Sequence, residues 1–246
     1  MSPPPVVAHR GLAAKYPENT LVAFRAALEA GASYLEVDLQ LSADGVAFVH
    51  HDWDTLRTCG VAGIVGEQTS AQLASLTAGF TSQFGEEFEA EPLPSLTDLC
   101  ALLEEWPDVT VFLEIKPQSV ERFGPGAVLD AILPHAELLG ARAVLLSFST
   151  EVLFAARERS PLSRGVACER HADLQSPTVE AIDPRHVFCD VDHLPSTGPL
   201  EIEGRTLTVW EVVDPDLAQA LLARGVDLIE SFSCDTLIPA LASREG

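Results

Sequence analysis

Short apolar segments alternate with amphipathic segments along most of this 246-residue chain. Mostly apolar runs of four to eight residues predict buried strands, and apolar residues three or four positions apart predict helices that cover them. The expected strands are Val6–Ala8, Tyr34–Leu41, Val109–Ile115, Ala143–Phe148, Gly165–Cys168, Val187–Asp190, Thr206–Val212 and Val226–Glu230. A helix or helix-like segment is expected after each strand, and this regular alternation is typical of a parallel α/β fold.

The predicted helices differ in how clearly the sequence marks their ends. Asn19 is the expected N-cap of the first, which Gly31 ends, and Ser95 with Asp98 predicts a capping box for the next. The remaining expected helices are Gly126–Leu139, Thr150–Arg159, about Ala172–Ile182, Asp214–Arg224 and Asp235–Ser243. Eight such units in 246 residues favour a TIM-type (β/α)8 barrel over an open sheet.

The segment Trp53–Leu93 interrupts this rhythm, because it is rich in Gly, Thr, Ser and Glu and has only short periodic pieces. We therefore expect one barrel domain over residues 1–246, with a small insertion after the second strand that lies over the barrel mouth. No glycine-rich nucleotide-binding motif opens a helix, which argues against a nucleotide-binding fold.

Charge and cysteine content restrict the class of protein. A formal net charge of -22 argues against binding to nucleic acid or to anionic lipid surfaces. The five cysteines are isolated in the sequence, as expected for reduced thiols in the cytoplasm. No apolar stretch approaches the roughly 20 residues of a membrane span, so no membrane insertion is expected. The sequence does not indicate an oligomeric state.

The strand Tyr34–Leu41 carries the most informative polar pattern. Its leucine and valine side chains should point to one face, whereas Glu36 and Asp38 should share the other, because side chains alternate along a strand. A turn at Ala43–Gly45 then returns the chain to His50, His51 and Asp52. Carboxylates that can hold a cation, beside an imidazole that can transfer protons, indicate metal-assisted hydrolysis.

Other candidate residues follow the first and third expected strands. His9 and Arg10 end the first strand, while Glu114 and Lys116 repeat the spacing of the carboxylate pair at the end of the third. Reactive groups of a barrel belong at these carboxyl ends. Each residue also has a plain structural interpretation, since His9 could be a loop residue, Arg10 could form a surface salt bridge and Lys116 could simply neutralise Glu114.

Taken in order, these motifs resemble the glycerophosphodiester phosphodiesterase family. The matching text is AHRG at 8–11, PENTLVAF at 17–24, GASYLEVDLQLSADG at 31–45, HD at 51–52, RT at 57–58, LPSL at 93–96 and LEIKP at 113–117. In the second half the resemblance is thinner, although Ser147-Phe148 and Val209-Trp210 still fit. The chain departs from the family at Glu211-Val212-Val213, where Thr-Val-Asn is common, and at Glu230-Ser231, where the last strand usually ends in Thr-Asp.

The resemblance implies a role for eight residues of this chain. It implies a divalent cation on Glu36, Asp38 and Glu114, acid-base catalysis by His9 and His51, phosphate contacts from Arg10 and Lys116, and packing of Trp210 against glycerol. The expected substrate is a small glycerophosphodiester, hydrolysed to sn-glycerol 3-phosphate and an alcohol. Oxygen ligands without a His or Cys cluster suit Mg²⁺ or Ca²⁺.

We expect His9 to act as the base and His51 as the acid, with the glycerol 2-hydroxyl attacking phosphorus to give a cyclic 1,2-phosphate. Two alternatives remain open at this point. One is a phospholipase-type diesterase acting on lipid headgroups. The other is a non-catalytic barrel that binds glycerophosphodiesters.

Overall fold

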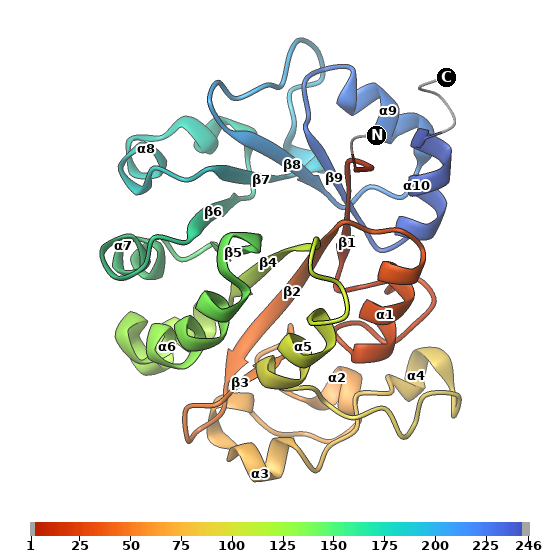
Figure 1. Ribbon diagram of the computed structural model, residues 1–246, viewed down its shortest axis with the longest axis vertical. Coiled ribbons are helices and arrows are strands. Elements are labelled where there is room, and N and C mark those ends of the chain that lie inside the picture. The colour runs from red at the N-terminus through yellow and green to blue at the C-terminus, as the bar shows by residue number, and fades with distance from the viewer. Residues whose placement is uncertain (1–2, 243–246) are drawn as a thin grey trace.

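Eight parallel strands close into a barrel in the computed structural model, which describes residues 3–242. They are β1 (Val6–His9), β2 (Tyr34–Leu41), β4 (Thr110–Ile115), β5 (Ala143–Ser147), β6 (Ser163–Cys168), β7 (His186–Asp190), β8 (Thr206–Trp210) and β9 (Leu228–Ser231). The ring closes because β1 pairs with both β2 and β9 (Figure 1). A short strand, β3 (Ala47–Val49), pairs antiparallel with β2 outside the ring. The predicted TIM-type barrel is confirmed.

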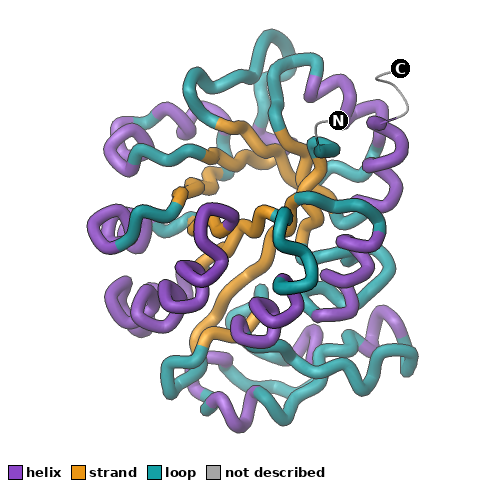
Figure 2. Tube along the Cα trace, in the orientation of Figure 1, coloured by secondary structure: helices purple, strands orange, loops and turns teal. Residues whose placement is uncertain are grey.

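Helices surround the strands, as the separation of purple and orange tubes in Figure 2 shows. The outer layer consists of α1 (Leu21–Glu29), α5 (Leu96–Leu103), α6 (Pro117–Leu139), α7 (Thr150–Arg159), α8 (Pro177–Ile182), α9 (Pro215–Leu222) and α10 (Cys234–Ala242). Short 3-10 turns are η1 (Val65–Glu67), η2 (Gly140–Arg142), η3 (His171–Gln175) and η4 (Val191–His193). The predicted capping box of Ser95 and Asp98 forms at the start of α5.

The two faces of the strands pack into two different hydrophobic clusters. The larger one fills the space between the strands and the helices and includes Leu35 and Val37 of β2. The smaller one fills the barrel interior with Val7, Phe112, Val144, Leu146, Ala167, Phe188 and Leu228. Residues two positions further along these strands therefore point inward above this interior layer. This parity places polar side chains at the carboxyl end of the barrel.

Two helices start or divide differently from the sequence expectation. Helix α6 starts at Pro117, earlier than the expected Gly126, and Gly124 breaks its regular backbone with a φ of 78°. The sequence Gly124-Pro125-Gly126 predicts a helix start, but here it only interrupts a longer helix. The expected helix over 172–182 is instead η3 followed by α8, because Ser176 caps a new helix that begins at Pro177.

Asn19 is not the N-cap of α1, contrary to the sequence expectation. Thr20 caps this helix and its side chain accepts the amide hydrogen of Ala23. Asn19 instead adopts a positive φ of 58° and its side-chain amide donates to Asp38 at 2.8 Å. An Asn beside a Thr can serve either role, and the buried carboxylate recruits Asn19 because it needs a donor.

The segment between β3 and α5 contains α2 (Leu56–Cys59), α3 (Ser70–Leu73) and α4 (Thr81–Phe84), seen at the bottom of Figure 1. Its apolar side chains, with Phe48 of β3, form a small separate cluster: Phe48, Val65, Leu73, Ala78 and Leu93. From α2, Arg57 reaches back to Asp52 and Glu18 beside the barrel mouth. Across residues 3–242, no helix has the length and apolar character needed to cross a bilayer.

Candidate active site

Polar residues from β1, β2 and β4 meet at the carboxyl end of the barrel. Strand pairing sets His9 beside Glu36 and Asp38 beside Glu114. All four are buried, as is Lys116 directly after β4. Burial of so many ionisable groups is rare unless they bind one another, a metal or a ligand.

Asp38 is the best-satisfied carboxylate of this group. One oxygen accepts the Asn19 amide and lies 3.1 Å from Arg10 Nε, while the other accepts from Lys116 Nζ at 3.0 Å. Burial alone would raise the pKa of Asp38, but the charges of Lys116 and Arg10 outweigh it and hold the pKa well below its usual range. Asp38 is therefore a carboxylate anion at neutral pH.

Glu36, unlike Asp38, has no lysine or arginine side chain of residues 3–242 bound to it, and its pKa is shifted in the opposite direction. Its Oε1 is buried and has no hydrogen-bond partner, and Oε2 accepts only a 3.3 Å bond from the Arg10 amide. Burial, and then repulsion from Asp38 and Glu230, raise the pKa of Glu36 well above its ordinary value. Glu36 thus has an oxygen free to accept a proton or a cation.

Glu114 shares its cation with Asp38. Its Oε1 accepts from Lys116 Nζ at 2.6 Å, so this ammonium lies between two carboxylates. One oxygen each from Glu36, Asp38 and Glu114 lie within 4.8 Å of one another. These are the three residues that the sequence resemblance assigns to a divalent cation, and the structure brings them together.

Each of the two candidate histidines has a carboxylate on its Nδ1. His9 Nδ1 lies 2.7 Å from Glu211 Oε2, and His51 Nδ1 lies 2.8 Å from Asp52 Oδ1. A carboxylate at this distance fixes hydrogen on Nδ1 and leaves Nε2 to exchange protons. Burial lowers the pKa of both imidazoles below the ordinary value, which favours their neutral forms.

A network of charged residues holds these carboxylates in turn. Arg57 donates from Nε to Asp52 at 2.7 Å and from Nη1 to Glu18 at 2.7 Å. Glu18 also accepts from Arg10 at 2.9 Å. Arg57 therefore connects the segment after β3 to both His51 and Arg10.

A cavity of about 150 Å³ joins these groups. Its polar wall is formed by His9, Arg10, His51, Glu114, Lys116 and Glu230, and its apolar wall by Leu146, Phe148, Ala167, Phe188 and Trp210. Trp210 meets Phe148 edge-on with ring centroids 5.7 Å apart. The cavity thus has one charged wall for an anion and one apolar wall for carbon.

The sequence predicts no role in the site for Glu211, Glu230 or Glu18, and it predicts Asn19 only as a helix cap. Glu211 and Glu230 had been noted only as departures from the family pattern, although both lie at carboxyl ends of predicted strands and so carried a usable indication. Glu18 and Asn19 make their contacts from a loop. The alternation of apolar and polar residues does not predict the path of a loop.

The chain matches the model of the glycerophosphoryl diester phosphodiesterase family over residues 9–230. A glycerophosphodiester phosphodiesterase of Caldanaerobacter subterraneus is 40% identical over 111 residues, which is 45% of this chain and 44% of that protein. The corresponding protein of Bacillus altitudinis is 36% identical over 121 residues, or 49% and 48% of the two chains. The matched part of this chain thus spans about half the length of these relatives.

Solved structures extend the likeness over nearly the whole chain. A phosphodiesterase of Oleispira antarctica, in complex with the product sn-glycerol-3-phosphate, superposes with a TM-score of 0.84 at 25% identity, covering 97% of each chain. A glycerophosphodiester phosphodiesterase of Agrobacterium tumefaciens gives a TM-score of 0.74 at 26% identity, covering 95% of this chain and 98% of that one.

Proposed function

Because this chain belongs to the glycerophosphoryl diester phosphodiesterase family, we propose that it hydrolyses glycerophosphodiesters to sn-glycerol 3-phosphate and an alcohol. The observation that carries the proposal is a single cavity lined by both histidines, by Arg10, by Lys116 and by Glu114, which belongs to the group of three carboxylates. Sn-glycerol 3-phosphate bound to the Oleispira relative supports the substrate class.

Glu36, Asp38 and Glu114 would hold a divalent cation. The fit rests on the unpartnered, buried Glu36 Oε1 and on three carboxylate oxygens within 4.8 Å of one another. Such an oxygen set suits Mg²⁺ or Ca²⁺. When bound, the ion would supply Lewis-acid charge stabilisation for phosphate and hydroxyl oxygens.

The two histidines would move the protons. His9 Nε2, with Nδ1 held by Glu211, would take the proton of the glycerol 2-hydroxyl as its oxygen attacks phosphorus. His51, oriented by Asp52, would give a proton to the leaving alcohol oxygen as its bond to phosphorus breaks. Arg10 and Lys116 would offset the negative charge that gathers on the phosphate oxygens.

The first product would be a cyclic 1,2-phosphate, which water then opens. A hydroxyl already tethered to the phosphate gains from proximity, with effective molarities of about 10⁵ M or more. In the second step the histidines exchange roles, since His51 would take a proton from water and His9 would return one to the 2-oxygen. Trp210 would pack against the glycerol carbons on the apolar wall.

A turnover assay tests the proposed function. Purified protein with Mg²⁺ should release sn-glycerol 3-phosphate from at least one of glycerophosphocholine, glycerophosphoethanolamine and glycerophosphoglycerol. Binding of these compounds without turnover would favour the non-catalytic barrel. Turnover of lysophospholipids alone would favour the lipid-headgroup diesterase.

Substrate analogues test the cyclic intermediate separately. A phosphodiester whose glycerol 2-position lacks oxygen should bind but barely turn over, and rapid quench of the native substrate should trap the cyclic phosphate. Equal kcat for the deoxy and native substrates would mean that water attacks phosphorus directly.

Cytoplasmic location is also part of the proposal. All five cysteines are free thiols. This is the state expected in a reducing compartment. Fractionation of native cells with an antibody against the chain would test it, and recovery outside the cytoplasm would reject it.

A further inference from the structure

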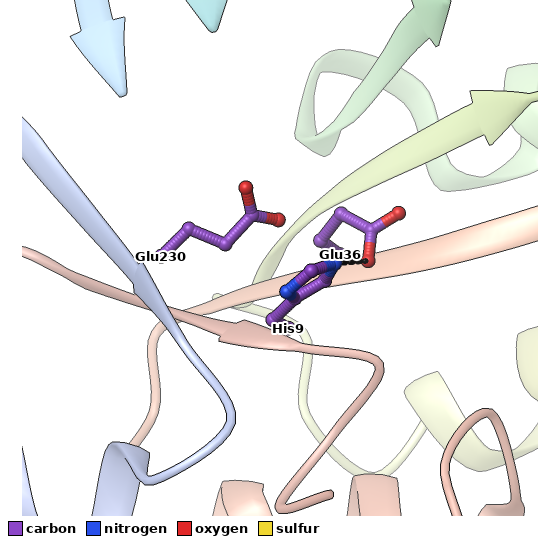
Figure 3. Close-up of side chains that lie close together, drawn as sticks. All are labelled: His9, Glu36 and Glu230. Carbon is purple, nitrogen blue, oxygen red and sulfur yellow. Dashed lines mark ion pairs between the residues drawn. The ribbon is translucent and has the colours of Figure 1, made fainter. Parts of the chain in front are cut away.

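The two departures from the family pattern converge on His9. Glu211 accepts from Nδ1 on one side of the ring at 2.7 Å, and Glu230 extends from β9 toward the same imidazole and toward Glu36 (Figure 3). His9, Glu36 and Glu230 lie on β1, β2 and β9, which are neighbours around the barrel. Neither glutamate is used in holding the three-carboxylate cation described above.

A nitrogen of His9 and one carboxylate oxygen each of Glu36 and Glu230 lie within 4.8 Å of one another. The side chains are deeply buried, since His9, Glu36 and Glu230 are 9%, 1% and 3% exposed. Oε1 of Glu36 and Oε1 of Glu230 each lack a hydrogen-bond partner. Two buried carboxylate oxygens without donors, beside an imidazole, point to a missing positive ligand.

Nearby cations do not meet this need. Lys116 is bound to Asp38 and Glu114, and Arg10 to Asp38 and Glu18. Among residues 3–242, Glu230 forms no salt bridge. Glu230 is therefore left without an ion-pair partner among the described side chains that surround it.

The donor set differs in chemistry from the three-carboxylate site. One imidazole with two carboxylates suits a borderline cation such as Zn²⁺, which commonly takes three protein ligands and leaves one position open. A ligand histidine usually donates its other N–H to a carboxylate, and Glu211 occupies that position on His9. Since Nδ1 is bound to Glu211, Nε2 is the nitrogen available to the metal.

We propose that His9, Glu36 and Glu230 form a second divalent-cation site, selective for Zn²⁺ over Mg²⁺, with Glu211 as the carboxylate that orients His9. Glu36 belongs to both sites and would bridge them through its two oxygens. One consequence rests on the proposed function. The single lone pair of His9 Nε2 binds either Zn²⁺ or a substrate proton, so Zn²⁺ at this site inhibits hydrolysis.

Titration calorimetry with Zn²⁺ on the metal-free protein tests the site by stoichiometry. The wild type should bind two ions, and Glu230→Gln should bind one, because it loses a ligand that only the second site uses. Glu114→Gln should also bind one, at the other site. Glu211→Gln should keep two sites with one weakened by about 10- to 100-fold, the usual effect of losing a carboxylate behind a ligand histidine.

Asp190→Asn is the matched control, because Asp190 also ends a barrel strand but lies outside both groups. It should bind Zn²⁺ like the wild type. Equal stoichiometry and affinity for wild type and Glu230→Gln would overturn the proposed site. So would a wild type that binds one ion only.

Inhibition separates this site from the proposed function. In saturating Mg²⁺, added Zn²⁺ should inhibit glycerophosphocholine turnover by the wild type, and Glu230→Gln should need at least about tenfold more Zn²⁺, as expected for a lost ligand. Equal inhibition of both proteins would overturn the inhibitory role. Absence of turnover in every protein, with calorimetry as expected, would reject the proposed function and leave the zinc site intact.

Discussion

The two halves of the barrel mouth differ in how their charges are balanced. On the first wall, formed by the ends of β1, β2 and β4, Asp38 and Glu114 are bound to Lys116, and Arg10 adds a second cation. The second wall, formed by the ends of β8 and β9, combines Trp210 with two glutamates, of which Glu230 has no hydrogen-bond partner on Oε1. His9 lies between the walls and contacts carboxylates of both.

This difference separates what the reaction requires from what is particular to this chain. The first wall repeats the family's ordered motifs and, in the proposed mechanism, would supply the acids, cations and imidazoles for phosphoryl transfer. The second wall carries the departures at Glu211 and Glu230. We therefore expect changes on the first wall to remove catalysis, and changes on the second wall to alter recognition and metal selectivity.

The largest effect should follow from Glu36→Gln. This change keeps the size of the side chain but removes a ligand anion, so Mg²⁺ binding and hydrolysis should both fall below detection. The amide can donate to the neighbouring carboxylates. The metal-free protein should therefore gain about 1 to 3 kcal/mol in free energy of unfolding, the usual cost of an unpartnered buried group.

Calorimetry with Mg²⁺ and urea unfolding measure the two effects of Glu36→Gln. The gain in stability should shrink as the pH falls. The pKa of Glu36 is raised in the folded protein, so folding is penalised at pH values where Glu36 is ionised in the unfolded chain. As the pH falls, Glu36 becomes protonated in the unfolded chain as well, and the wild type loses this penalty. Gln has no such penalty at any pH. Retained Mg²⁺ affinity would show that Glu36 is not a ligand.

Loss of either histidine should have the next largest effect. His9→Ala and His51→Ala should each lower kcat by about 10² to 10⁴, the range for a lost acid-base group, and should leave Mg²⁺ affinity nearly unchanged. His193→Ala is the control, because His193 is half-exposed after β7 and lies outside the cavity. Near-wild-type turnover by either active-site variant, with a substrate that has a poor leaving group, would remove that histidine from the mechanism.

A smaller effect is expected on the second wall from Trp210→Ala. Packing of an aromatic ring contributes about 0.5 to 1.5 kcal/mol beyond area burial, so kcat/KM should fall by about two- to tenfold. The loss should be similar for every headgroup, because Trp210 would contact the common glycerol. A loss that depends strongly on the headgroup would instead place the leaving alcohol against Trp210.

The smallest effect on rate should come from replacing Trp53–Leu93 with a short turn. This segment follows His51 and Asp52, so we expect it to shape the side that meets the leaving alcohol. The ranking of glycerophosphodiester headgroups should change more than Mg²⁺ affinity does. Arg57→Gln in the full-length chain should be measured in the same assay, because Arg57 binds Asp52 and Glu18. This variant separates the ion pairs of the segment from the space that the segment fills. An unchanged ranking would assign the segment to stability or assembly.

The sequence predicted the barrel because strands buried on both faces appear as short apolar runs, and these runs alternate with amphipathic helices. Parity along β2 and β4 also predicted which way Glu36, Asp38 and Glu114 point. Local capping chemistry was less decisive. Ser95 capped its helix as expected, but Thr20 and not Asn19 caps α1, because Asp38 on another strand binds the Asn19 amide.

What the sequence did not predict depends on contacts between distant segments. The bond between His9 and Glu211 spans 202 positions, and no local pattern links those residues. No local pattern predicts that Glu230 Oε1 lacks a hydrogen-bond partner either. This follows only from the positions of the neighbouring side chains in the folded chain. The first wall was predictable because its motifs are dense. The second wall was not predictable because it departs from the family pattern.

The most direct test of the account is a ³¹P NMR time course of sn-glycero-3-phosphocholine with the purified protein. With Mg²⁺ or Ca²⁺, the diester resonance should be replaced by that of sn-glycerol 3-phosphate. Excess chelator should stop the conversion, and restored cation should resume it. Full conversion in excess chelator, or no conversion of any glycerophosphodiester with either cation, would contradict the account.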